Sequence, residues 1–176
     1  MVPDINKVRF PQRKNPRLKD FDYASANCYF VTVCTHDKAW LFGPPGGEKG
    51  WGLLAAEGFL QLESHFPEAR VEKFVIMPNH VHALIFLNGE GRSLPVIIGQ
   101  YKSYVSRQIR GSAGDIQVWQ ASFHDHVVRT REGYQKIWQY IDSNPMTWEK
   151  DCFFEENTAA AALSDPALQE KTEVII

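Results

Sequence analysis

His80 and His82 are the residues whose type and spacing first suggest chemistry. They open an apolar run that follows a second apolar run across the turn signal Pro78-Asn79. Successive side chains of a strand point to opposite faces, so both imidazoles are expected on one face of a sheet. Two polar rings in a segment built for burial cost free energy unless they find partners. A shared metal ion would be such a partner, although a chance pair with this spacing is more often two half-exposed surface histidines.

Tyr140 and Asn144 form a second pair, at the end of a predicted helix. Residues four apart share a helical face, so the phenol and the carboxamide are expected to point the same way. A tyrosine that attacks phosphorus needs a held phosphate, a cation that polarises its oxygens and a route for the phenolic proton. His80, His82 and Asn144 could be ligands of that cation. Two imidazoles with oxygen donors suit Mn²⁺ or Mg²⁺ when phosphate is present, and Zn²⁺ or Ni²⁺ could occupy the same site.

Length and composition indicate one domain. At 176 residues, with 44% hydrophobic and 12% aromatic residues, the chain can bury a proper core. Its three cysteines lack a CxxC pair, which favours reduced, buried thiols and a cytoplasmic protein. The first residues do not resemble a signal peptide, and no apolar run approaches the roughly 18 residues of a membrane helix. We therefore expect no membrane partner.

Charge is distributed unevenly along the chain. The net charge is −2, yet residues 1–19 carry six basic side chains against one acidic, and residues 149–176 carry seven acidic against two basic. Three regions are predicted: a basic extended arm over 1–22, a domain over 23–150 and an acidic tail over 151–176. A solvated tail is the usual state of such an arm, but its spacing also suits a phosphate backbone. Little function is expected in the acidic tail.

The strands and helices that must position these two residue pairs are predicted from the periodicity of apolar residues. Strands are predicted over 28–35, 70–77, 80–87 and 123–128, the middle two as a hairpin. Helices are predicted over 51–66, 94–110 and 131–143, with Ser93 and Thr130 as caps of the last two. The order β, α, β, β, α, β, α indicates an α+β fold. We expect an antiparallel sheet of four to five strands with helices packed on it, of the ferredoxin-like kind.

Two motifs give the chain a resemblance to a known family. The segment PNHVHALI, with His80 and His82, and the segment YIDSNP, from Tyr140 to Pro145, resemble the HUH single-tyrosine transposases, and more closely the REP-associated tyrosine transposase branch. The segments RKNPRLKDFDY, YFVTVCTHDKAWLFG and WQASFHDHVVRTREGYQKIWQYIDSNPMTW are also similar to that branch. The resemblance runs from about Arg13 to Trp148, and the full set of motifs is highly specific, whereas HxH alone is weak.

The resemblance implies a site-specific single-stranded DNA endonuclease and strand transferase. Tyr140 would attack the scissile phosphate to form a 5′-phosphotyrosine intermediate and free a 3′-OH, and a second 3′-OH would reverse the step. The resemblance implies a divalent metal, Mg²⁺ or Mn²⁺, as cofactor and no energy cofactor, because the phosphodiester energy is kept in the covalent link. In related insertion-sequence transposases the residue four after the tyrosine is typically glutamine, where this chain has Asn144. Those relatives work as dimers, whereas the REP-associated branch can act as monomers, so a homodimer is possible.

The substrate implied by the resemblance is a DNA hairpin with a short conserved tetranucleotide at its foot. The basic arm would read that foot, and the second helix would supply backbone contacts. A solvated helix face is the commoner role for any one of the helix residues. The DNA-binding residues predicted in this way are Arg13, Lys14, Arg17, Lys19, Lys102, Arg107 and Arg110.

Several other residues compete for these roles. Tyr104 is followed four residues later by Gln108, which copies the insertion-sequence spacing, but the motif context belongs to Tyr140. His124 and His126 form a second HxH pair, for which packing beside the site is favoured over metal or phosphate contact. The lone histidines His36 and His65 are expected to be structural or solvated. Core positions are expected for Trp119, Trp138 and Trp148.

Two other functions fit the same residues. A protein of this fold with an incomplete metal site would bind hairpins and regulate without forming a covalent adduct. A metal-dependent hydrolase of small phosphoesters would use the histidines alone and would survive Tyr140→Phe. The basic arm favours a polymer substrate over this last class.

Overall fold

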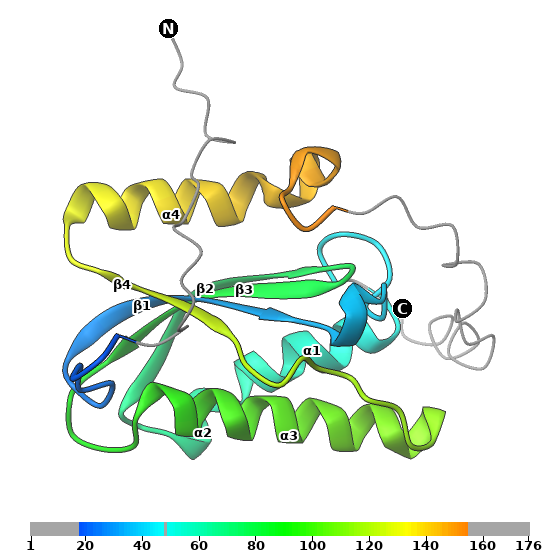
Figure 1. Ribbon diagram of the computed structural model, residues 1–176, viewed down its shortest axis with the longest axis horizontal. Helices are drawn as coiled ribbons and strands as arrows, with labels where there is room; N and C mark the ends of the chain where they lie inside the picture. The colour runs from blue at the N-terminus through cyan, green and yellow to red at the C-terminus, as the bar shows by residue number, and fades with distance from the viewer. Residues whose placement is uncertain (1–17, 48, 155–176) are drawn as a thin grey trace, which may run out of the picture.

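The computed structural model describes residues 18–47 and 49–154. The chain forms a four-stranded antiparallel sheet with the strand order β2-β3-β1-β4. Helices α1, α2 and α3 lie against one face and α4 lies against the other (Figure 1). The predicted α+β class and antiparallel sheet are therefore confirmed, with four strands in the described residues. The elements are β1 (Asn27–Cys34), η2 (His36–Lys38), α1 (Trp51–Leu60), α2 (Leu62–His65), β2 (Ala69–Met77), β3 (His80–Leu87), α3 (Leu94–Ala113), β4 (His124–Val128), α4 (Arg131–Ser143) and η3 (Asn144–Lys150).

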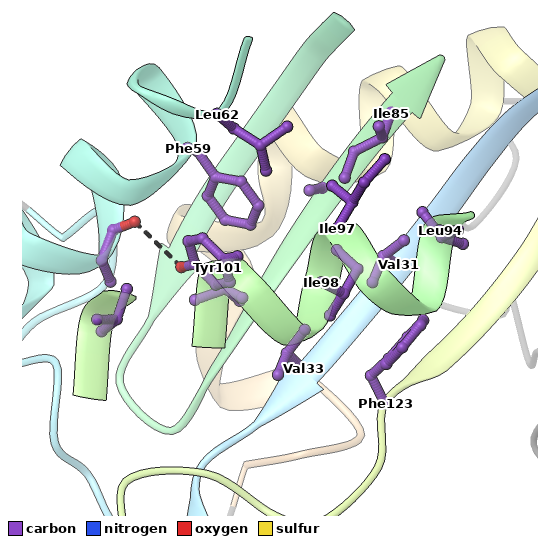
Figure 2. Packing of buried hydrophobic residues seen from close by; sticks show 14 of the residues in the cluster. Val31, Val33, Phe59, Leu62, Ile85, Leu94, Ile97, Ile98, Tyr101 and Phe123 are labelled. Carbon is purple, nitrogen blue, oxygen red and sulfur yellow. Dashed lines mark hydrogen bonds between the residues drawn. The ribbon is translucent and has the colours of Figure 1, made fainter. Parts of the chain in front are cut away.

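Alternation along β1 divides the core into two layers. Tyr29, Val31 and Val33 face α1 and α3, whereas Phe30 faces α4. Figure 2 shows the larger layer, in which Val31 and Val33 meet side chains of α3. Strand β3 alternates in the same way, which is the reason that its two histidines share the α4 face with Phe30.

The helix boundaries differ from the prediction in two places. The helix predicted over 51–66 is interrupted at Gln61, between α1 and α2, and α3 continues past Arg110 to Ala113. Thr130 caps α4 as predicted, because its side chain accepts a hydrogen bond from the Gly133 amide. Ser93 has the extended backbone of a cap, but its side chain makes no capping hydrogen bond.

The predicted acidic tail begins with residues that belong to the domain. Asn79 Nδ2 donates to the Phe153 carbonyl at 2.9 Å, and Phe154 packs beside Trp40 and Trp148. The first four residues of that region therefore cover the α4 face of the sheet. The thiols are free, but only Cys34 is buried and Cys152 is exposed, so the expectation of buried thiols is wrong for Cys152. No helix in the described ranges is both long and apolar enough to cross a membrane.

Candidate active site

The β2–β3 hairpin brings His80 and His82 to one buried point. Both histidines lie on the α4 face, as predicted, with His80 opposite Cys34 and His82 opposite Thr32 on β1. Their side chains are 0% and 1% exposed, and their Nε2 atoms are 3.0 Å apart. Two neighbouring ligands at about 2.1 Å from an octahedral cation are about 3 Å apart, so this spacing fits one shared ion. The alternative of two half-exposed surface histidines is wrong.

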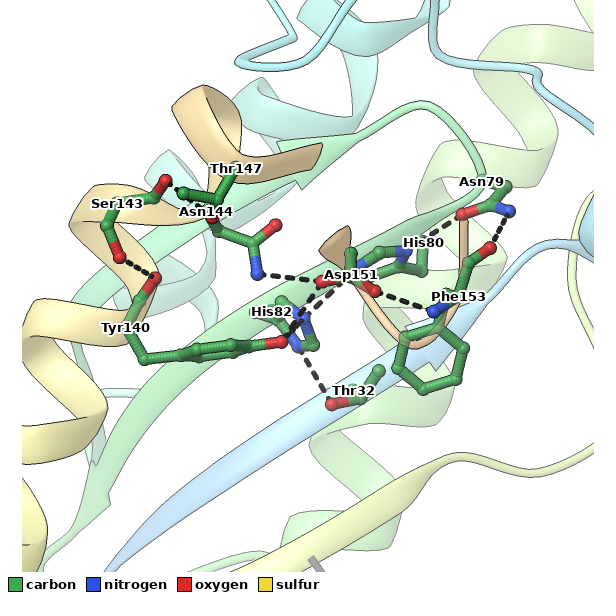
Figure 3. Close-up of polar contacts among 10 residues, drawn as sticks. All are labelled: Thr32, Asn79, His80, His82, Tyr140, Ser143, Asn144, Thr147, Asp151 and Phe153. Atoms are coloured by element: carbon green, nitrogen blue, oxygen red, sulfur yellow. Dashed lines mark hydrogen bonds and ion pairs between the residues drawn. The ribbon is translucent and has the colours of Figure 1, made fainter. Parts of the chain in front are cut away.

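Hydrogen bonds fix both rings with Nε2 pointing into the site (Figure 3). His80 Nδ1 lies 2.8 Å from Asn79 Oδ1, and His82 Nδ1 lies 2.8 Å from Thr32 Oγ1. The Asn79 amide is itself oriented, because its Nδ2 donates to the Phe153 carbonyl. Asn79 Oδ1 can only accept, so His80 carries its proton on Nδ1 and leaves Nε2 free to bind a cation.

Burial keeps both histidines in the form that binds metal. The pKa of His80 is held well below its ordinary value, first by burial and then by the neighbouring His82. Burial lowers the pKa of His82 to about 4, against the opposing effect of the Asp151 carboxylate. Both imidazoles are therefore neutral near pH 7, as metal ligation requires.

Tyr140 reaches the same point from α4. Ile137 and Ile141 pack this helix onto the sheet, and Phe30 meets the Tyr140 ring edge-on with centroids 6.0 Å apart. The phenolic oxygen lies 3.2 Å from His82 Nε2 and donates to Asp151 Oδ2 at 3.1 Å. Burial, and then the negative charge of Asp151, raise the pKa of Tyr140 far above its ordinary value. The phenol is therefore neutral, and its ionisation requires a cation or a base nearby.

Asn144 lies one turn after Tyr140 and is 2% exposed. Its Nδ2 donates to Asp151 Oδ2 at 2.9 Å, while no described residue donates to its buried Oδ1. A buried, unpartnered amide oxygen costs about 1–3 kcal/mol unless something binds it. The predicted shared face of Tyr140 and Asn144 is confirmed, and Oδ1 is the atom that a cation or a water molecule would satisfy.

Asp151 is the site residue that the sequence reasoning missed. Its side chain is 2% exposed, and its Oδ2 lies 4.0 Å from His80 Nε2. Its Oδ1 accepts from the Phe153 amide at 2.7 Å, which orients the carboxylate toward Tyr140. Ligand atoms of His80, His82 and Asp151 lie within 4.8 Å of one another. Two imidazoles and a carboxylate form a donor set that suits a divalent cation, and the Asn144 carboxamide faces this set through its Nδ2.

His124 and His126 lie beside this centre and not in it. Register pairs His124 with Thr32 and His126 with Phe30, so both share the α4 face with His82. His124 is exposed and His126 is half-buried. With β1 between β4 and β3, the His124 and His82 backbones are about 10 Å apart. The second histidine pair therefore lies on the α4 face of the sheet, on the other side of β1 from His82.

Other predicted residues lie elsewhere. Tyr104 packs against the core on the α3 side of the sheet, which separates it from His82. His36 is half-buried beside Asp37, and His65 is exposed. The core tryptophans are Trp119 and Trp148, which are 5% and 7% exposed, and Trp138 is half-buried.

The predicted DNA-binding residues fall into two groups. Arg13, Lys14 and Arg17 lie outside the described residues, and Lys19 is exposed. The other three, Lys102, Arg107 and Arg110, lie on α3, on the opposite face of the sheet from Tyr140 (Figure 1).

Comparison with known proteins shows where this fold occurs. A solved structure of a REP-associated tyrosine transposase bound to a REP hairpin matches with a TM-score of 0.61 at 16% identity, covering 75% of this chain and 73% of the other. That match establishes a shared fold. A putative transposase from Deinococcus radiodurans is more distant, with a TM-score of 0.46, 15% identity and coverage of 72% and 95%.

Sequence comparison adds a relative without a known function. An uncharacterized protein of Haemophilus influenzae is 28% identical over 164 residues, which cover 79% of this chain and 91% of the relative. No family model matches the chain.

Proposed function

We propose that this protein is a site-specific single-stranded DNA endonuclease and strand transferase, a transposase that acts on palindromic hairpin DNA through Tyr140. One observation carries the proposal: the helix-borne phenol of Tyr140 lies 3.2 Å from His82 Nε2 and donates to Asp151 Oδ2. A nucleophile beside a set of metal ligands is the arrangement that phosphoryl transfer needs. The shared fold with a transposase that was solved with a REP hairpin supports this choice of substrate.

His80, His82 and Asp151 would hold the divalent cation, and Asn144 would join them through Oδ1 once its carboxamide turns to bring that atom, in place of Nδ2, toward the site. Mn²⁺ fits two nitrogen donors better than Mg²⁺, which prefers oxygen, although either fits the complete set when phosphate oxygens join it. When bound, the cation polarises the oxygens of the scissile phosphate and stabilises the charge that develops on them. In this proposal Asn144 remains a metal ligand, as expected from the sequence, and Asp151 joins the ligand set.

Tyr140 would form one bond to phosphorus in the cleavage step and lose that bond in the strand-transfer step. Its phenolic oxygen attacks phosphorus, the bond from phosphorus to the 3′ oxygen breaks, and the DNA 5′ phosphate remains on the tyrosine. The released 3′ oxygen takes a proton from water. A second 3′-OH then attacks the same phosphorus and gives its proton to solvent, and Tyr140 leaves and takes back its own proton from Asp151, so that no external energy is consumed.

Asp151 would receive the phenolic proton. Its Oδ2 already accepts the hydrogen bond from Tyr140 at 3.1 Å, so the proton has a short path to a carboxylate oxygen. Asn144 Nδ2 donates to the same oxygen and keeps it oriented. The rigid placement of Tyr140, between Phe30 and His82, limits the attack to one direction.

DNA recognition would depend on the basic arm over residues 1–22. The basic side chains of the arm, Arg13, Lys14, Arg17 and Lys19, would contact the foot of the hairpin beside the cleavage point. Their charge suits a phosphate backbone, and an extended segment can follow a single strand.

A cleavage assay with labelled hairpins tests the proposal. Single-stranded hairpins from the flanks of the protein's own gene, labelled at either end, are incubated with the protein and Mn²⁺ or Mg²⁺. The proposal predicts a 3′-labelled fragment that stays with the protein on a denaturing gel and is lost in Tyr140→Phe and His82→Ala but kept in Tyr104→Phe. Hairpin binding without an adduct would instead indicate the regulatory function. Phosphoester hydrolysis that survives Tyr140→Phe would indicate a simple hydrolase.

A further inference from the structure

The outward face of α3 carries a regular stripe of small and basic residues. The stripe occupies helix positions i, i+3, i+4, i+7, i+8 and i+11, which share one face. Its members are Gly99, Lys102, Ser103, Ser106, Arg107 and Arg110. The segment 117–121 runs along this face and closes a groove of ≈ 380 Å³ with it. This groove lies on the opposite layer from Tyr140 and takes no part in the chemistry proposed above.

The charged side chains that line the groove are all basic. Three basic side chains and no acidic one are among the residues that line it in the described part of the chain. Arg107 donates to Ser103 Oγ at 3.2 Å. Arg110 donates to the Ile116 carbonyl at 3.2 Å and forms an exposed ion pair with Asp115, outside the groove lining, at 3.4 Å. A guanidinium has five N–H donors, so each arginine has further donors for an anion. The small residues between them let a bulky backbone approach the helix.

Lys102 holds the segment 117–121, which forms one wall of the groove, against α3. Its ammonium donates to the carbonyls of Gln120 at 2.6 Å and Ala121 at 3.1 Å, and Trp119 Nε1 donates to the Lys102 carbonyl at 3.1 Å. These bonds hold the segment 117–121 at a fixed distance from α3. Its predicted contact with DNA is therefore better assigned to Arg107 and Arg110.

The lining of the groove exposes almost no aromatic surface to a ligand. Trp119, the one aromatic residue in the lining, is 5% exposed, and its ring packs against Phe42 and Tyr101. Proteins that hold single strands stack bases on exposed rings, whereas a duplex keeps the faces of its bases stacked inside and presents phosphates, sugars and base edges. Guanidinium, hydroxyl and carboxamide groups are the usual donors to a DNA backbone. The groove therefore suits paired nucleic acid better than unpaired.

We propose that this groove binds the sugar-phosphate backbone of the paired stem of the DNA hairpin, with Arg107 and Arg110 on phosphates. The inference rests on the proposed function, because it takes a hairpin as the substrate. The stripe from residue 99 to 110 is about 16 Å long, which matches about five phosphates of one strand. A stem held on this layer leaves the unpaired foot free to reach Tyr140 around the β4 edge.

Hairpin binding as a function of salt tests the groove. All variants carry Tyr140→Phe, so that binding is measured without cleavage, by fluorescence anisotropy with a labelled hairpin. Arg107→Gln/Arg110→Gln is compared with Arg70→Gln/Lys136→Gln, which removes the same charge from exposed positions outside the groove. The groove pair is expected to raise Kd at least about 10-fold and to reduce the slope of log K against log salt by about two. The comparison pair is expected to bind as the parent does.

Two further measurements complete the test. Ser106→Glu, which adds a negative charge to the groove floor, is expected to weaken hairpin binding, and neither groove variant should weaken binding of the unpaired foot alone. The assignment is overturned if the groove variants bind the hairpin with the parent's Kd and salt slope, or if they weaken the single strand equally. Failure of the proposed function is seen separately, as the absence of a Tyr140 adduct in the wild-type protein. If the parent protein binds no hairpin, both the assignment of the groove and the proposed function are overturned.

Discussion

Tyr140 and His82 meet in the structure although 58 residues separate them in the sequence. The phenolic oxygen lies 3.2 Å from Nε2 of the histidine, and the two rings are 5.2 Å apart. The contact depends on two local patterns, the alternation along β3 and the apolar stripe of α4, which place both side chains in the same layer. The predictions below test how each part of this arrangement contributes.

Removal of the Asn79 side chain should weaken metal binding without touching a ligand. Asn79 Oδ1 orients His80 through Nδ1, and such supporting contacts are typically worth 10–100-fold in metal affinity. Asn79→Ala is therefore expected to raise the Kd for Mn²⁺ by at least about 10-fold in isothermal titration calorimetry. Asn27→Ala, at the far end of β1, is the matched control. Equal affinities in the two variants would show that the His80 orientation is not fixed by Asn79.

Asp151→Asn tests the ligand that the sequence did not reveal. The change keeps the size of the side chain but removes the charge that faces His80 and Tyr140. We expect the Mn²⁺ affinity to fall by at least about 10-fold, because a neutral amide oxygen is a weaker ligand than a carboxylate. The same calorimetric titration gives the result. An unchanged Kd would assign the site to His80, His82 and Asn144 alone, as first predicted.

Stability of the metal-free protein should fall as pH drops from 7 to 5. The pKa of His82 is about 4 in the folded chain against an ordinary value of 6.5, so the unfolded chain takes up the proton first. Stability is therefore complete above pH 6.5 and is lost on acidification, by up to ~1.4 kcal/mol for each unit of pKa difference. Urea denaturation with a chelator present measures it. The loss should be smaller in His82→Gln, and a flat profile in the parent would contradict the buried, neutral imidazoles.

Ile141 should matter to stability more than any exposed neighbour. It is 1% exposed and packs α4 onto the sheet. Ile141→Ala is expected to reduce the free energy of unfolding by about 2–5 kcal/mol, from lost burial and the remaining cavity. Gln139→Ala, on the exposed side of α4, should stay within about 0.5 kcal/mol. Similar effects of the two changes in urea denaturation would mean that α4 is not anchored through Ile141.

The sequence predicted most of the fold and four of the five residues that meet at the candidate site, and particular residues show why. The alternation along β3 and the four-residue spacing of Tyr140 and Asn144 are local periodicities, so they can be read before the fold is known. Asp151 was missed because the chain between Pro145 and Lys150 is a 3₁₀ segment with an irregular Thr147, and no period relates it to α4. Lys102 was predicted as a DNA contact because its carbonyl partners come from a loop about twenty residues later, which no local pattern reveals.

The most direct test of the central claim is mass spectrometry of the wild-type protein after reaction with an unlabelled hairpin and Mn²⁺. Nuclease digestion of the bound DNA, followed by proteolysis, should leave a 5′-linked nucleotide on the peptide that contains Tyr140. The account predicts this adduct on Tyr140, and its absence in His80→Ala and His82→Ala. An adduct on another residue such as Tyr104, or cleaved DNA with no adduct at all, would contradict it.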